Sequence, residues 1–124
     1  MTDTLTSCID LYIDMWNEED AARRADLIAA AWTDDASYVD PLLAADGPDA
    51  ISEMVATVHG HYPGHRFRRT SGIDAHHDLA RFGWELVAPD GAVFVAGVDV
   101  ATVAEDGRLR TIAGFFGDPP ARED

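Results

Sequence analysis

Residues 32–41, with the sequence WTDDASYVDP, lie where a helical pattern of the chain ends and an extended pattern begins. The stretch closes with Asp40 directly before Pro41. A residue that precedes proline is displaced from helical toward extended geometry, so we expect Asp40 at a strand end with a restrained backbone. Because Asp-Pro is also a common turn, the stretch alone is compatible with either a catalytic base or a plain turn.

Two helices are predicted before this stretch. Apolar residues in 5–16 recur at the i, i+3, i+4, i+7 spacing of a helix that buries one stripe. Tyr12 lies in the middle of that stripe, so its buried hydroxyl needs a partner, for which a main-chain carbonyl is the ordinary solution. A second, alanine-rich helix is expected to run from about residue 20 to Trp32.

A short strand and a third helix are predicted next. Alternation in 36–40 places Tyr38 and Asp40 on the same face of the strand, so their side chains should share an environment. After a loop over 42–47, Pro48 occupies a first helical position, and apolar residues at helical spacing continue to about Gly60.

From Arg66 onward the apolar pattern changes to a period of two. Strands are predicted at 66–73, 79–87, 93–103 and 109–117, and turn sequences separate them. The prediction is an α+β fold in which three N-terminal helices pack on a twisted, mainly antiparallel sheet, in the order α-α-β-α-β-β-β-β.

The strand at 93–103 is apolar on both faces, which predicts a central strand buried on both sides. The helices can cover one face, and a second copy of the chain is the simplest cover for the other, so we expect a homodimer through the sheet. Asp99 is then a carboxyl group in an apolar row. It should either pair with an arginine such as Arg81 or retain a proton because its pKa is raised.

Composition excludes several kinds of function. The formal charge of the 124 residues is −14, and all nine basic residues are arginine. Without lysine, Schiff-base chemistry, pyridoxal phosphate attachment and a phosphate-loop site are excluded. So acidic a chain should not bind nucleic acid. We expect one domain at 1–118 and a flexible tail at 119–124.

Cysteine content and hydropathy indicate the cellular setting. The single cysteine, Cys8, rules out an intrachain disulfide. No apolar run approaches the roughly 18 residues of a membrane span, and residues 1–6 do not resemble a signal peptide. We therefore expect a cytoplasmic protein that does not bind membranes.

Histidines cluster at His59, His61 and His65, which is the composition of a metal site. However, Gly60 and Pro63 interrupt the helix that would fix their spacing, and no carboxylate recurs with them. We therefore predict no metal ion and no organic cofactor.

Three motifs occur together in this sequence. Tyr12 precedes Asn17, at the end of the first helix, by five residues; an Asp-Asp-Ala turn at 34–36 precedes Asp40 and its proline; and Asp99 stands between two valines on the penultimate strand. With the order of elements, these motifs make the whole chain resemble the nuclear transport factor 2-like superfamily. Within it, the chain looks most like the ketosteroid isomerase and SnoaL-like polyketide cyclase branch.

The resemblance implies a cystatin-like cone with a deep apolar pocket for a small apolar carbonyl compound. Asp40 would be a general base that moves a proton next to the carbonyl, while Tyr12 and a protonated Asp99 would hydrogen-bond the enolate oxygen. The pocket is expected to be lined by Trp16, Trp32, Tyr38, Met54, Val58, Trp84 and Phe116.

The sequence departs from the steroid isomerases at two places. Those enzymes support the oxyanion tyrosine with tyrosines on the second and third helices, where this chain has Trp32 and Met54. Steroid specificity is therefore not implied. A non-catalytic binding module for small apolar ligands on the same fold is the alternative, because a fold does not by itself give a function.

Overall fold

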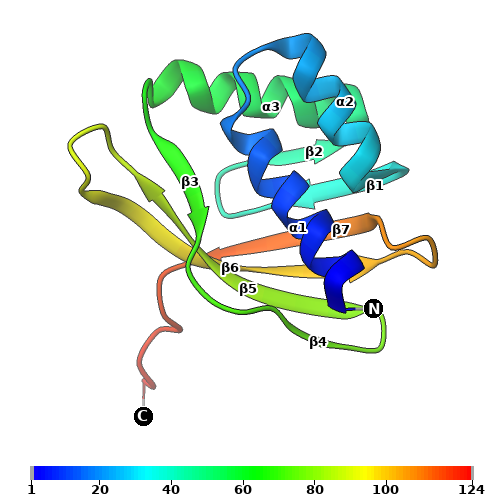
Figure 1. Ribbon diagram of the computed structural model, residues 1–124. Helices are drawn as coiled ribbons and strands as arrows, with labels where there is room; N and C mark the ends of the chain where they lie inside the picture. Colours follow the sequence, from blue (N-terminus) through cyan, green and yellow to red (C-terminus); the bar gives the residue numbers. More distant parts are fainter. Residues whose placement is uncertain (1, 124) are drawn as a thin grey trace.

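The structure, a computed structural model, describes residues 2–123. Helices and strands follow one another in the order shown in Figure 1. Their bounds are α1 Thr2–Asn17, α2 Ala21–Ala31, β1 Trp32–Val39, β2 Ala44–Asp46, α3 Pro48–His61, β3 Arg66–Arg69, β4 Asp74–His76, β5 Leu79–Val87, β6 Val93–Val103 and β7 Leu109–Phe116.

Seven strands form one curved sheet, and the three helices lie on one side of it (Figure 1). The strand order is β2-β1-β7-β6-β5-β3, and β4 pairs with the start of β5. All pairs are antiparallel except β1 with β7, which run parallel because the chain crosses the whole domain between them. The predicted α+β class, with helices packed on a mainly antiparallel sheet, is confirmed.

The boundaries near residue 32 differ from the prediction. Helix α2 ends at Ala31, and Trp32 already has extended backbone angles while its N–H closes the last helical turn on Ile28. Strand β1 therefore begins four residues earlier than expected. The predicted loop at 42–47 also contains the short strand β2, which pairs with the end of β1.

The strand predicted at 66–73 is divided into β3 and β4. Between them, the backbone N–H of Gly83 donates to Ser71 Oγ at 2.8 Å, so a side chain takes the place of one main-chain partner. Both pieces still pair with β5, as the predicted hairpin requires. The predicted limits of β5 and β6 match the structure, and β7 ends one residue earlier than predicted.

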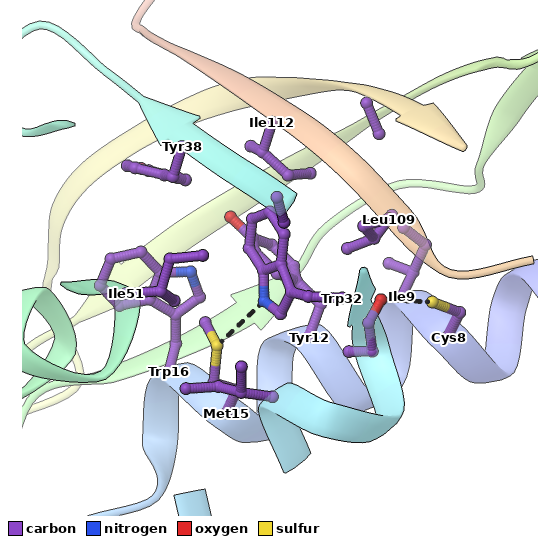
Figure 2. Close-up of a cluster of buried hydrophobic side chains, with 14 of the residues drawn as sticks. Cys8, Ile9, Tyr12, Met15, Trp16, Trp32, Tyr38, Ile51, Leu109 and Ile112 are labelled. Atoms are coloured by element: carbon purple, nitrogen blue, oxygen red, sulfur yellow. Dashed lines mark hydrogen bonds between the residues drawn. The ribbon is translucent and has the colours of Figure 1, made fainter. Parts of the chain in front are cut away.

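The core lies between α1 and the inner face of the sheet. Figure 2 shows Trp32 among the side chains of α1, where its indole N–H donates to Met15 Sδ at 3.2 Å. Cys8 is also a core residue, and its thiol donates to the carbonyl oxygen of Ala31. At the end of α1, the side chain of Asn17 exchanges two hydrogen bonds with the backbone of Phe67, which ties the helix to β3.

Strand β6 is central in the sheet, but only one of its faces is buried within this chain. On the outer face, Val98 is 37% exposed, and Phe115, its partner on β7, is 60% exposed. All three helices lie on the other side of the sheet, so the outer face of β6 is uncovered in the single chain, and its burial by a second copy stays a prediction.

The last described residues, 117–123, form no helix or strand. Asp124 lies outside the described residues, so the flexibility of the tail at 119–124 stays a prediction. Among residues 2–123, no helix is both long enough and apolar enough to cross a membrane.

Candidate active site

A cavity of about 350 Å³ opens between α1, the end of α3 and the inner face of the sheet. Its walls are mainly aromatic and aliphatic, and two carboxyl groups, Asp40 and Asp99, interrupt them. None of the described residues that line it is basic. The lining residues are Tyr12, Ile13, Trp16, Tyr38, Asp40, Leu42, Leu43, Val58, Tyr62, Phe67, Trp84, Leu86, Phe94, Val95, Asp99 and Phe116.

Asp99 and Tyr12 form a buried pair at the inner end of this cavity. The Tyr12 hydroxyl donates to Asp99 Oδ2 at 2.7 Å, across 87 residues of sequence. Edge-on contacts with Trp32 and Phe82 hold the Tyr12 ring, with centroids 5.6 and 6.1 Å away. The partner of Tyr12 is thus a carboxyl group, not the main-chain carbonyl expected for an ordinary core tyrosine.

Burial controls the protonation of this pair. Asp99 is 4% exposed, and burial, which penalises the charged form, raises its pKa from the ordinary value of 3.8 to about 7. The hydrogen bond from Tyr12 and the indole of Trp84 act in the opposite direction, while the charge of Asp40 raises the pKa further. The pKa of Tyr12 is also raised well above 10, first by burial and then by Asp99.

The alternative of an ion pair between Asp99 and Arg81 is wrong. Arg81 Nε lies 2.8 Å from Asp74 Oδ2, on the outer face of the sheet. Asp99 stands opposite Phe82 in the β5–β6 ladder, so its side chain points to the other face from that of Arg81. Asp99 Oδ1 is buried and has no hydrogen-bond partner among the described residues.

Asp40 is held at the wall of the same cavity by a second tyrosine and by its own turn. The Tyr38 hydroxyl donates to Asp40 Oδ2 at 2.6 Å, which confirms that these two side chains share one face. Oδ1 accepts the backbone N–H groups of Leu42 and Leu43, each at 2.8 Å. The N–H of Asp40 donates to the Leu43 carbonyl, so the turn around Pro41 is closed.

Gly114 on β7 allows the two carboxyl groups to approach each other. A Cβ atom at this position would lie 2.9 Å from Asp99 Oδ1, 3.2 Å from Asp40 Cβ and 3.4 Å from the Tyr38 hydroxyl oxygen. The first two distances are too short for an undisturbed contact. The absence of a side chain at Gly114 is therefore what lets Asp40, Asp99 and Tyr38 surround one point of the sheet.

A second glycine makes room for Trp84. A Cβ atom at Gly97 would lie 2.7 Å from the Trp84 ring, so the indole packs directly over this part of β6. Trp84 Nε1 is buried and has no hydrogen-bond partner within residues 2–123, but its N–H still favours the charged form of Asp99.

Most of the predicted pocket residues line the cavity, and two do not. Trp16, Tyr38, Val58, Trp84 and Phe116 line it together with Tyr12, Asp40 and Asp99. Trp32 and Met54 do not, and this corrects the prediction for both. They are buried in the core, because Trp32 starts β1 under α1 and donates to Met15 (Figure 2), while Met54 belongs to the buried face of α3.

The sequence did not predict that Tyr62 and Phe94 line the cavity, or that the Tyr38 hydroxyl donates to Asp40. The rings of Tyr62 and Phe94 meet at 4.9 Å, and both line the cavity. A register shift opposite Leu86 lets Phe94 and its neighbour Val95 both reach the cavity, which a strict period of two would forbid. The alternation that paired Tyr38 with Asp40 was the available signal for the hydrogen bond.

The histidine cluster has other contacts. His59 Nε2 lies 2.7 Å from the carbonyl oxygen of Trp16, and His65 Nδ1 lies 3.2 Å from that of Pro63. Within residues 2–123, no three His, Cys, Asp or Glu side chains are grouped so as to hold a metal ion.

Comparison with solved structures assigns the class of protein. The fold is similar to that of solved proteins described as having cystatin-like and NTF2-like folds. One of these, from Methylobium petroleophilum, shares 21% identity over all of this chain and 82% of its own, with a TM-score of 0.77. At this identity the likeness shows the fold alone.

The chain belongs to the SnoaL-like family. The family model for the SnoaL-like domain matches residues 9–112. A SnoaL-like family protein from Agrobacterium tumefaciens, provisionally named an isomerase, shares 34% identity over 94% of this chain and 99% of its own, with a TM-score of 0.87. A protein from Jannaschia, provisionally named a SnoaL-like polyketide cyclase, shares 16% identity over 90% and 85%, with a TM-score of 0.66. None of the curated proteins matches the chain.

Proposed function

We propose that this protein is an isomerase or cyclase that moves a proton between carbon atoms next to a carbonyl group. One observation carries the proposal: Asp40, Tyr12 and Asp99, from three distant parts of the chain, line a single apolar cavity. Asp40 acts as the general base. The Tyr12 hydroxyl, which donates to Asp99 in this structure, turns to the oxygen on which the enolate charge develops, and protonated Asp99 donates to the same oxygen.

The shape and charge of the cavity define the class of substrate. Its volume of about 350 Å³ is near the lower end of the range for small-molecule sites, about 300 to 1,000 Å³. With two carboxyl groups and no basic side chain among its described lining residues, the cavity disfavours carboxylates and phosphates. The substrate is therefore a small, uncharged and largely apolar carbonyl compound. Because side chains supply both the base and the oxyanion donors, the proposed reaction uses no metal ion or organic cofactor.

The test is deuterium exchange next to the carbonyl of a bound ketone, followed by NMR in the wild type and in Asp40→Asn. A positioned base contributes about 10²- to 10⁴-fold in rate, so the variant should lose exchange by that factor. The matched control is Asp46→Asn, which removes an exposed carboxylate from β2 outside the cavity and should keep full exchange. Circular dichroism checks that Asp40→Asn is folded, and persistent exchange in this folded variant excludes Asp40 as the base.

The hydrogen bonding of Asp40 favours one competing function. Three protein donors already engage its carboxylate, as in a turn that serves structure alone. On that reading the protein binds small apolar ligands without turnover. The exchange experiment distinguishes the two functions, because a binding module takes up the ketone and leaves its deuterium content unchanged.

We further propose that two copies pair through the outer face of the sheet. Exposed apolar residues lie there on four adjacent strands, Val39 on β1, Phe115 on β7, Val98 on β6 and Leu79 on β5. Two ion pairs on this face, Arg81 with Asp74 and Arg68 with Glu85, contribute no net charge to it, although the whole chain carries −14. These pairs therefore do not add to the repulsion between two acidic chains.

Sedimentation analysis tests the pairing. The wild type should sediment as a dimer, and Phe115→Asp as a monomer, because it places a charge in the centre of the apolar face. Ala56→Asp, which adds the same charge to an exposed position of α3, should stay dimeric. A monomeric wild type at micromolar concentration contradicts the pairing.

A further inference from the structure

The two carboxylate oxygens of Asp40 are not equivalent. Each oxygen of a carboxylate has two lone pairs that can accept hydrogen bonds. Oδ1 accepts two, from the backbone N–H groups of Leu42 and Leu43, so both of its lone pairs are in use. Oδ2 accepts one, from the Tyr38 hydroxyl, and keeps a lone pair for another proton.

Tyr38 is itself fixed in place. Its ring is 4% exposed and packs edge-on against Trp16, with the centroids 5.5 Å apart. Burial, followed by the charges of Asp99 and Asp40, holds the pKa of Tyr38 far above its ordinary value of 10. The hydroxyl therefore keeps its proton at neutral pH and donates it to the hydrogen bond with Asp40.

We propose that Oδ2 of Asp40 is the atom that takes and returns the substrate proton, and that Tyr38 is the positioning residue that holds this oxygen at the cavity. This inference rests on the proposed function. The free lone pair of Oδ2 accepts the proton from the carbon next to the carbonyl. The C–H electron pair becomes the enolate, whose oxygen is held by Tyr12 and Asp99, and Oδ2 then returns the proton to another carbon.

Tyr38→Phe tests the positioning role, because it keeps the buried ring and removes only the hydroxyl. Loss of one hydrogen bond to a charged group, with the freedom that this gives the carboxylate, should lower the maximal exchange rate at least about 10-fold. The ketone concentration at half-saturation should change less than about twofold, because Tyr38 holds the base and not the substrate. An unchanged maximal rate overturns the proposal.

The matched control is Thr33→Val, which removes a hydroxyl from the same strand, outside the cavity. The Thr33 hydroxyl also donates to a carboxylate, Asp35 Oδ1 at 2.8 Å, and neither residue lines the cavity. The variant should exchange the ketone at the wild-type rate. If Thr33→Val is as slow as Tyr38→Phe, the effect belongs to β1 as a whole and the positioning role is wrong.

A second readout is independent of turnover. The proton in the 2.6 Å bond between Tyr38 and Asp40 should give a far-downfield ¹H NMR signal, assigned by its loss in Tyr38→Phe. Asp40→Asn should move this signal upfield, whereas Thr33→Val should leave it unchanged. If the wild type exchanges no ketone, the proposed function fails, and the signal still decides whether Tyr38 holds Asp40. A signal that Asp40→Asn does not move overturns the inference.

Discussion

The cavity contains two tyrosine–aspartate pairs on either side of Gly114, with the same chemistry in different surroundings. Tyr12 and Asp99 come from α1 and β6, and the oxygen of Asp99 that Tyr12 does not bind has no hydrogen-bond partner in the described part of the chain. Tyr38 and Asp40 stand two residues apart at the end of β1, and backbone N–H groups of the turn satisfy the other oxygen of Asp40. The difference teaches that the number of donors and the depth of burial, more than the residue type, set the protonation of a carboxyl group.

The largest expected effect concerns the stability of the buried pair. The pKa of Asp99 rises from 3.8 when it is exposed to about 7 in the folded protein, so the folded state holds its proton over a pH range in which the unfolded state has lost it. Stability from this group is therefore lost as pH rises from about 4 to about 7 and is constant above. A pKa shift of about three units lowers the free energy of unfolding, above pH 7, by on the order of 4 kcal/mol.

Asp99→Asn removes this penalty. Its free energy of unfolding, relative to the wild type, should increase between pH 4 and pH 7 and then level off, as measured by urea denaturation at each pH. If the difference in free energy of unfolding between the variant and the wild type does not change from pH 4 to pH 7, the pKa of Asp99 is not raised.

The next effect disturbs both pairs together. Gly114→Ala introduces a Cβ atom 2.9 Å from Asp99 Oδ1 and 3.2 Å from Asp40 Cβ, so at least one carboxyl group must move. A displacement of about 1 Å costs on the order of 10²-fold in rate, and the strain costs about 1 to 3 kcal/mol in stability. Exchange kinetics and thermal unfolding measure the two effects. Wild-type exchange in Gly114→Ala would show that the spacing of the pairs does not matter.

The smallest effect concerns the Asp99 pair alone. Trp84→Phe removes an N–H that lowers the pKa of Asp99, so this pKa should rise above about 7, by less than about one unit. Carboxyl ¹³C NMR titration of Asp99 measures the change. Phe67→Leu, which alters an aromatic wall of the same cavity without removing a donor, should leave the Asp99 titration in place. A lower pKa of Asp99 in Trp84→Phe would show that the indole raises this pKa instead of lowering it.

The sequence predicted those parts of the fold that depend on local pattern. The limits of β5 and β6 follow from extended runs between turn sequences, and the shared environment of Tyr38 and Asp40 follows from alternation on one strand. The division of 66–73 into two strands depends on Ser71, whose hydroxyl meets a strand 12 residues away, and no local pattern encodes that contact.

The sequence predicted both carboxyl groups that line the cavity, but only part of its apolar wall. Trp32 and Met54 have the size and polarity of pocket residues, and only the packing of α1 and α3 shows that they belong to the core. The importance of Gly114 could not be inferred either, because a glycine in a strand gives no sign of which side chains fill the space beside it. The inner and outer faces of β6 are equally apolar, so the sequence could not tell which one the helices cover.

The central claim is that the two pairs have different tasks, and phenol binding tests it most directly. A phenol places its oxygen where the enolate oxygen would lie, so it reports the donors Tyr12 and Asp99 without requiring turnover. Titration calorimetry should show that Asp99→Leu binds phenol at least about 10-fold more weakly than the wild type, while Asp40→Asn binds it at least as tightly. Equal losses of affinity in the two variants, or none in Asp99→Leu, would contradict the division of tasks.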